Sequence, residues 1–225
     1  MNPSADPDYR LLFDNNRRWV DEVRRTDPEL FARLARQQAP KYFWIGCSDS
    51  RVPANEIIDL APGEVFVHRN VANVMPPSDL NALSTLQFAV DILRVEHVLV
   101  VGHYGCSGIK TVLDGRRVGL ADNWLGHVRE VMDSHAARLS ALPDPGVRYE
   151  RLCELNALEQ ALNVCRTTVL RDAWSRGQRV TVHACVYGLK DGLLRDLGLR
   201  AGDARGAAES FARALQSIDH GVTLR

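Results

Sequence analysis

The segment that decides the fold reads His97-Val-Leu-Val-Val-Gly-His-Tyr-Gly-Cys106, and a second segment of the same kind reads Lys41-Tyr-Phe-Trp-Ile-Gly-Cys-Ser-Asp-Ser-Arg51. Each begins with a run of aliphatic, β-branched or aromatic residues, which is typical of a buried strand. Each then passes through glycine into polar residues, which marks the end of the strand. The two segments therefore predict two buried strands, each followed at once by polar side chains and a cysteine.

Further strands and helices alternate along the chain. Strand-like runs are found at 64–68 and 179–187, and helical periodicity is found at 80–94, 124–139, 149–174 and 211–215. Strands that alternate with helices predict an α/β fold, in which a mostly parallel central sheet is flanked by helices.

No Pro/Gly/Ser-rich linker divides the 225 residues, so we expect a single domain, 1–225. Within it, 41–199 is expected to form the α/β core that carries the site, and 200–225 a C-terminal extension. Residues 1–38 are expected to form an N-terminal helical arm. Their apolar residues stand in a charged background, which suits an amphipathic helix lying on another surface: Leu11, Leu12, Phe13, Trp19 and Val20.

The composition limits which binding partners and which cellular compartment we expect. Lys+Arg and Asp+Glu each number 28, a balance that argues against general attraction to nucleic acid or to an anionic membrane. No run approaches the roughly 18 apolar residues of a membrane span, and residues 1–10 are polar, unlike a secretory signal. We therefore expect a cytoplasmic protein, and in that reducing setting the five cysteines suggest metal binding or catalysis rather than disulfides.

Three metal-ligating side chains follow the two decisive strands. Cys47 follows the first, and His103 and Cys106 follow the second. Sites in open α/β sheets lie just past the carboxyl ends of the strands, so these residues are expected to meet. Two thiolates and an imidazole suit one Zn²⁺ per subunit, with a fourth position left for water whose pKa the metal lowers to about 7.

Asp49 and Arg51 lie beside this predicted site, and their roles are open at this point. Arg51 is placed to hold Asp49 ionised through a bidentate fork, so that Asp49 accepts a hydrogen bond from bound hydroxide. Alternatively, Asp49 is itself the fourth zinc ligand and closes the site. A third reading is an ordinary surface pair that contributes little.

These residues together resemble the β-class carbonic anhydrases. The resemblance implies Zn²⁺ on Cys47, His103 and Cys106, a catalytic pair of Asp49 and Arg51, and reversible hydration of CO2 to bicarbonate by zinc-bound hydroxide. It also implies self-association as a homodimer or homotetramer, which suits the amphipathic arm. The matching motifs are Cys47-Ser-Asp-Ser-Arg51, Gly102-His-x-x-Cys106, the run from Pro62 to Asn73, Ser84-x-x-Gln87-x-Ala89, Asn123-Trp-Leu125 and Gly188-x-x-Asp191-Gly192.

A narrower resemblance is to β-class enzymes of bacterial and algal type that bicarbonate inhibits at a separate pocket. The positions that match their pocket are Trp44, Arg69 and Tyr187. The resemblance implies that bicarbonate there, and low pH, favour a state in which Asp49 leaves Arg51 and ligates zinc. Bicarbonate must bind that state more tightly for this to hold.

Three alternatives and one departure from the family remain. The same zinc fold could act on another small substrate such as carbon disulfide, could be a non-catalytic zinc protein, or could be a thiol redox sensor that uses Cys47 and Cys106. The departure is Ser107, where the family usually has glycine. We expect Ser107 to be a helix N-cap rather than a residue strained at positive φ.

Overall fold

Parallel strands form the centre of the protein in the computed structural model, which describes residues 6–36 and 38–220. The chain divides into two compact units, residues 1–38 and 39–225. Residues 1–5 and 37 of the predicted arm, and 221–225 of the predicted extension, lie outside the described residues.

The first unit is helical. It consists of α1 (Pro7–Thr26) and α2 (Leu30–Arg36). Asp6 caps α1, since its side chain accepts from the backbone N–H of Asp8, and Pro7 stands in the first turn, where no intrahelical donor is lost. No residue of α1 is buried, and its large apolar side chains are exposed: Tyr9, Leu11, Leu12, Phe13 and Trp19. The predicted N-terminal helix is present, and within the first unit Trp19 of α1 packs edge-on against Phe31 of α2.

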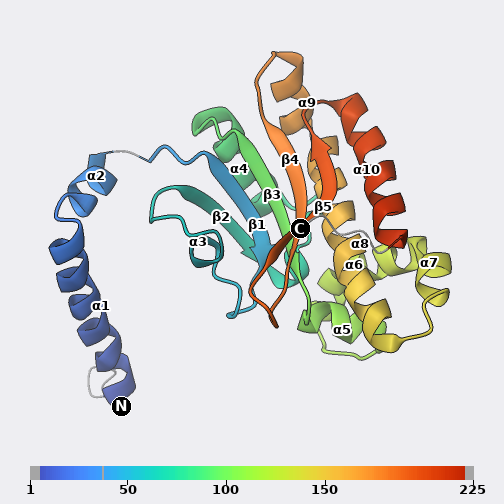
Figure 1. Cartoon of the computed structure of the whole chain (residues 1–225), viewed down its shortest axis with the longest axis horizontal. Helices are drawn as coiled ribbons and strands as arrows, with labels where there is room; N and C mark the ends of the chain where they lie inside the picture. The colour runs from blue at the N-terminus through green and yellow to red at the C-terminus, as the bar shows by residue number, and fades with distance from the viewer. Residues whose placement is uncertain (1–5, 37, 221–225) are drawn as a thin grey trace. The chain divides into compact units, whose positions relative to one another are not determined.

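A five-stranded sheet lies at the centre of the second unit (Figure 1). Its order is β2-β1-β3-β4-β5, in which β1 pairs in parallel with β2 and β3, β3 pairs in parallel with β4, and β5 is antiparallel to β4. The predicted α/β fold with a mostly parallel sheet is confirmed. The strands are β1 (Tyr42–Cys47), β2 (Val65–Asn70), β3 (His97–His103), β4 (Thr181–Tyr187) and β5 (Leu194–Ala201).

Strand β5 was not predicted. Its sequence mixes leucine with charged residues, which lacks a β signature, and Gly198 interrupts it at a positive φ of 82°. What makes it a strand is a tight return from β4, in which Gly188 N–H donates to the Leu193 carbonyl at 2.9 Å. The boundary at 199/200 between the predicted core and extension falls inside this strand.

Helices flank the sheet, and three predicted helices are each divided in two. The predicted 80–94 helix passes into a π-helix at Phe88, and the predicted 124–139 helix is interrupted at His135. The predicted 149–174 helix breaks at Thr167, whose side chain caps the next helix by accepting from Leu170 N–H. The elements are α3 (Ala54–Ile57), the 3₁₀ turn η2 (Val71–Asn73), α4 (Leu80–Gln87), the π-helix η3 (Phe88–Ile92), α5 (Ser107–Leu113), α6 (Ala121–Ser134), α7 (Ala136–Ser140), α8 (Pro145–Arg166), α9 (Thr168–Ser175) and α10 (Ala204–Asp219). Within the described residues, no helix is both long and apolar enough to pass through a membrane.

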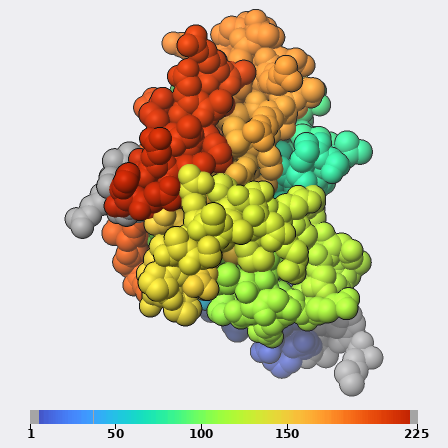
Figure 2. Space-filling model, turned by 90° about the vertical axis from the view of Figure 1, so that its right-hand side faces the viewer, coloured from blue at the N-terminus to red at the C-terminus, as the bar shows by residue number. Residues whose placement is uncertain are grey.

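The core lies on both faces of the sheet, because successive residues of a strand point to opposite sides. On β3, Val98 and Val100 belong to the larger apolar cluster, whereas Val101 belongs to a smaller cluster that also contains Trp44 and Cys185. Burial on both faces explains the continuous apolar runs that predicted these strands. Figure 2 shows the helical surface, on which α10 lies beside the α8–α9 segment.

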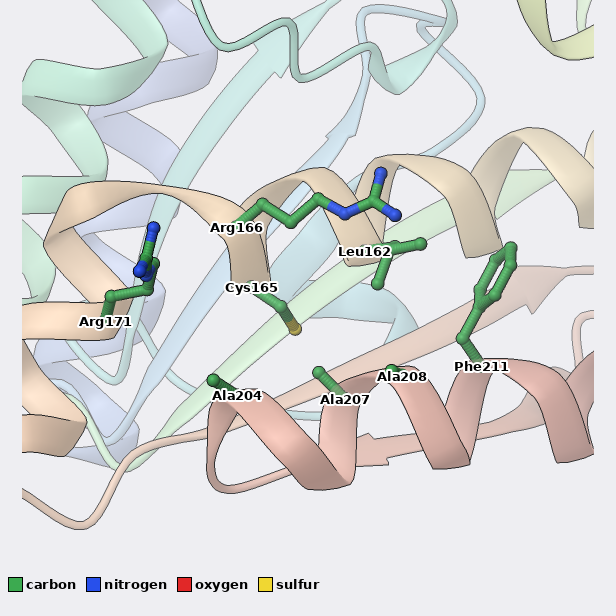
Figure 3. A pocket seen from close by; sticks show the side chains of 8 residues that line it. All are labelled: Leu162, Cys165, Arg166, Arg171, Ala204, Ala207, Ala208 and Phe211. Carbon is green, nitrogen blue, oxygen red and sulfur yellow. The ribbon is translucent and has the colours of Figure 1, made fainter.

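A groove of about 350 Å³ lies between α8 and α10 (Figure 3). Leu162 and Cys165 of α8 face Ala207 and Phe211 of α10 across it. None of its lining residues belongs to the predicted metal set, so the groove is separate from that site.

Candidate metal centre

The three predicted metal ligands lie together at the carboxyl ends of two neighbouring strands. Cys47 is the last residue of β1, His103 is the last residue of β3, and Cys106 immediately precedes α5. Because β1 and β3 are paired in parallel with Gly46 opposite Val101, their ends bring Cys47 and His103 side by side. The donor atoms of all three residues lie within 4.8 Å of one another, all three are buried, and the two Sγ atoms are 3.9 Å apart.

The imidazole of His103 is oriented as a ligand. Its Nδ1 lies 3.1 Å from the Tyr104 carbonyl oxygen, which only accepts, so Nδ1 carries the proton and donates. In the neutral ring Nε2 is then a bare acceptor. Nε2 is buried with no hydrogen-bond partner, and the residue is 1% exposed. A buried acceptor without a donor is costly unless a positive group completes the site.

The two thiols form a coupled pair. The Cys106 thiol donates to Cys47, and this hydrogen bond lowers the pKa of the Cys47 thiol against the opposing effect of burial. The same interaction and burial raise the pKa of Cys106. One thiolate is therefore stabilised without a metal, and a bound cation would favour the second. Two sulfurs and one imidazole nitrogen in a compact, buried cluster fit Zn²⁺.

Asp49 and Arg51 form the predicted fork. Arg51 Nε and Nη2 donate to the two carboxylate oxygens at 2.8 and 2.6 Å, and the Arg51 backbone N–H adds a third bond at 3.0 Å. These bonds, above all those from the guanidinium, hold the pKa of the Asp49 carboxyl far below its usual range. Asp49 Oδ2 lies 3.7 Å from Nε2 of His103, and the aspartate side chain is only 12% exposed. The pair thus faces the ligand cluster, unlike an ordinary surface pair.

A cavity of about 570 Å³ opens on the outer side of Arg51. Tyr104, Tyr149 and Arg195 also line it. It is large enough for a small anion or a buffer molecule to approach Arg51 from solvent.

The three residues of the predicted regulatory pocket lie on β1, β2 and β4, of which β1 and β2 are adjacent and β4 is separated from β1 by β3. Trp44 on β1 is 0% exposed, and its Nε1 is buried without a partner. Trp44 packs in the same small apolar cluster as Tyr187, the last residue of β4. Arg69 on β2 pairs with Gly46, and its Nε donates to the Cys47 carbonyl at 2.7 Å. Its Nη2 donates to the Asp49 carbonyl. Among the described residues, no hydrogen bond joins the three side chains to one another.

Sequence reasoning missed a polar layer beneath the site. Tyr149 Oη donates to the Cys106 carbonyl at 2.7 Å, Tyr104 Oη donates to Glu154 Oε1 at 2.6 Å, and Asn156 Nδ2 donates to the Ala72 carbonyl at 2.8 Å. The signal that could have revealed this layer is the presence of Glu154 and Asn156 in a helix where every residue from Leu152 to Leu158 is buried. Polar residues on such a face need partners.

Ser107 differs from the prediction in detail. The residue that caps α5 is Cys106, with an extended φ of −67° and ψ of 115°, and Ser107 is the first helical residue. Ser107 is not among the described residues with positive φ, so the strained alternative does not apply. Its exposed side chain is compatible with the observed turn.

Comparison with known proteins agrees with this geometry. A family model described as carbonic anhydrase matches residues 42–194, which include every residue of the ligand cluster. The chain belongs to the carbonic anhydrase family. It is 46% identical over 188 residues to the carbonic anhydrase of Emericella nidulans, covering 84% of this chain and 82% of the relative. It is 32% identical over 207 residues to the mitochondrial β carbonic anhydrase 6 of Arabidopsis thaliana, covering 85% and 69% respectively.

Solved structures agree on the class. The β-carbonic anhydrase of Coccomyxa in complex with acetazolamide superposes with a TM-score of 0.83 at 37% identity, covering 98% of this chain and 94% of the other. A structure described among two tetrameric β-carbonic anhydrases of Sordaria macrospora gives 0.82 at 34% identity, covering 87% and 100%. The chain is therefore a β-class carbonic anhydrase and an enzyme, as predicted. These two relatives are fungal and plant proteins, so they give no support to the predicted bacterial type or to the predicted bicarbonate-regulated subgroup.

Proposed function

We propose that this carbonic anhydrase hydrates CO2 reversibly to bicarbonate and a proton, with Zn²⁺ held by Cys47, His103 and Cys106. The observation that carries the proposal is the buried, unpartnered Nε2 of His103 beside the two cysteine sulfurs. When bound there, zinc lowers the pKa of a water molecule to about 7 and so makes hydroxide available near neutrality.

The chain's own contribution is orientation by Asp49. Its carboxylate stays ionised throughout the neutral range, because Arg51 occupies both oxygens on one side. Oδ2 then lies 3.7 Å from Nε2 of His103, on the side of the ring that faces the ligand cluster. A fixed acceptor there takes a hydrogen bond from the attacking oxygen and directs its remaining lone pair toward carbon. The released proton passes to buffer, for which the cavity beside Arg51 offers access.

A finer proposal concerns regulation. We propose that bicarbonate binds between Trp44, Arg69 and Tyr187, and that this favours a state in which Asp49 leaves Arg51 and becomes a zinc ligand. The Nε1–H of Trp44 is a buried hydrogen-bond donor that has no acceptor in the structure. Arg69 donates to the carbonyls of Cys47 and Asp49, so an anion that draws Arg69 away releases the backbone that carries Asp49. Protons favour the same state, because a carboxylate displaces neutral water more readily than hydroxide.

We also propose self-association as a homodimer or homotetramer. Large apolar side chains are exposed around β2 and η3 as well as on α1: Val67, Val71, Leu80, Phe88 and Ile92 in the second unit. A second copy would remove this surface from water. The neighbour from Sordaria macrospora is described as tetrameric. Sedimentation analysis of the whole chain tests this, and a monomer at micromolar concentration would contradict it.

A reducing compartment such as the cytoplasm remains the proposed location. The sulfurs of Cys47 and Cys106 lie 3.9 Å apart and must remain thiolates to hold a metal. Imaging of the tagged chain checks this, and a signal confined to an oxidising compartment would contradict it.

The deciding experiment is stopped-flow CO2 hydration by zinc-loaded protein between about pH 7 and about pH 9, which brackets the titration of metal-bound water. Fast hydration that rises steeply with pH is expected, with a strong loss in Asp49→Ala. Bound zinc without hydration would favour another small substrate such as carbon disulfide, or a non-catalytic zinc protein. A reversible Cys47–Cys106 disulfide without metal would favour a redox sensor.

A further inference from the structure

Tyr104 decides which nitrogen of His103 carries the proton. Its carbonyl oxygen accepts from His103 Nδ1 at 3.1 Å. Its own backbone N–H donates to the Tyr187 carbonyl at 3.0 Å, just before the turn at Gly105 with φ of 77°. If that carbonyl turned away, Nδ1 would lose its acceptor and the ring would be free to protonate on Nε2, the nitrogen that faces the sulfurs.

The side chain of Tyr104 is anchored to a buried carboxylate. Tyr104 Oη donates to Glu154 Oε1 at 2.6 Å, and Glu154 is only 6% exposed. It stands on α8 among the apolar residues Leu152, Leu155 and Leu158. A carboxylate in such surroundings costs free energy that an apolar side chain would not. Packing of α8 therefore does not explain why a glutamate occupies this position.

The second carboxylate oxygen of Glu154, the one that does not accept from Tyr104, lies beside an arginine. Arg151 Nε lies 2.9 Å from Glu154 Oε2, and Arg151 Nη1 lies 3.7 Å from Asp219 at the end of α10. Arg138 contacts the same aspartate at 3.1 Å. Arg151 thus links the Glu154 carboxylate to α10 through ion pairs, although neither Arg151 Nε nor Glu154 Oε2 has a hydrogen-bond partner.

We propose that Tyr104 and Glu154 are positioning residues for His103. The Tyr104 hydroxyl, held by the buried Glu154 carboxylate, fixes the adjoining carbonyl and so keeps His103 in the form that presents a bare Nε2 to Cys47 and Cys106. This inference rests on the proposed function in one respect, namely that these three residues hold zinc.

The test is Tyr104→Phe, which removes a single oxygen and keeps the ring. Two measurements follow: the ¹⁵N chemical shifts of the His103 ring in metal-free protein, and zinc affinity by competition with a chelator. The wild-type ring is expected to be protonated on Nδ1 alone, and the variant to populate both neutral forms. Zinc affinity is expected to fall roughly tenfold, the scale found when outer partners of metal ligands are removed.

Further variants separate positioning from packing. Glu154→Leu is expected to behave like Tyr104→Phe, whereas Glu154→Gln, whose amide oxygen still accepts from the tyrosine, is expected to restore the Nδ1 form and most of the affinity. Tyr42→Phe at the opposite end of β1 is the matched control and should change neither measurement. A merely structural role would change unfolding free energy in these variants without moving the ring shifts.

A folded Tyr104→Phe variant with wild-type ring shifts and wild-type zinc affinity would overturn the inference. That result differs from failure of the proposed function, in which the wild-type chain itself would not bind zinc. Even then the ring shifts of the metal-free protein would still report whether Tyr104 sets the proton on His103.

Discussion

Arg51 holds Asp49 through two parallel hydrogen bonds, from Nε to Oδ1 at 2.8 Å and from Nη2 to Oδ2 at 2.6 Å. These bonds orient the carboxylate so that Oδ2 lies 3.7 Å from Nε2 of His103. The Arg51 side chain is 55% exposed and the Asp49 side chain is only 12% exposed, so the arginine lies on the solvent side of the pair. The pair therefore places an oriented acceptor beside the candidate ligand cluster.

Arg51→Lys should lower the hydration rate without removing zinc. An ammonium keeps the charge but cannot form two parallel bonds, so Asp49 would stay ionised and lose its orientation. We expect kcat to fall at least about tenfold, which corresponds to roughly 1.4 kcal/mol of transition-state stabilisation. The control is Arg33→Lys, because Arg33 makes the same two-pronged bond to Asp27 in the first unit. Equal rates in both variants would contradict the role of the fork.

Cys106→Ser should abolish stable zinc binding. A serine hydroxyl stays protonated at neutral pH and cannot replace a thiolate. The zinc-to-chain ratio, measured by atomic emission after gel filtration, should fall from about one to well below one. Cys165→Ser is the control, since Cys165 is equally buried but lies on α8 beside the groove of Figure 3. Full zinc retention by Cys106→Ser would remove Cys106 from the ligand set.

Trp44→Phe should weaken inhibition by bicarbonate. The substitution removes the unpartnered indole N–H and keeps an aromatic ring in the core. Loss of one hydrogen bond to an anion corresponds to about tenfold in the inhibition constant. The measurement is CO2 hydration at increasing bicarbonate concentration, with the change in inhibition constant compared with the change in kcat.

Arg69→Ala completes this test. Because Arg69 also donates to the backbone of Cys47 and Asp49, its loss should reduce basal activity as well as inhibition. Inhibition constants that remain at the wild-type value in both variants would leave the regulatory pocket without support.

Stability should fall in acid because of His183. Burial, with a further contribution from His97, whose Nδ1 lies 3.1 Å from His183 Nε2, lowers the pKa of His183 to about 4. Asp196 opposes and Arg200 reinforces the shift. The unfolded chain therefore takes up this proton first, so stability is lost as pH falls from about 6.5 toward 4, by up to roughly 1.4 kcal/mol per pH unit.

Urea unfolding of wild type and His183→Gln at several pH values checks this. The difference between the two proteins reports on His183 and its contact with His97, since all other titrating groups are shared. The slope of unfolding free energy against pH should be shallower in the variant between pH 6.5 and 4. Parallel curves would show that His183 does not titrate differently on folding.

The ligand cluster could be predicted because its geometry follows from strand order alone. Cys47 and His103 end strands whose apolar runs are legible in the sequence, and parallel pairing then places them together. Strand β5 and residue Glu154 could not be predicted in this way. The first depends on a return from β4 that local propensity does not encode, and the second on contacts between α8 and the loop at Tyr104, far apart in sequence.

The hydrogen bonds of Arg69 bear on the affinity of the proposed bicarbonate site. In the structure its guanidinium already serves the carbonyls of Cys47 and Asp49. An incoming anion must therefore compete with the protein's own backbone for the same donors, and only the difference between the two sets of bonds appears as affinity. The proposed bicarbonate site would therefore bind its anion weakly and would fill only at high anion concentration.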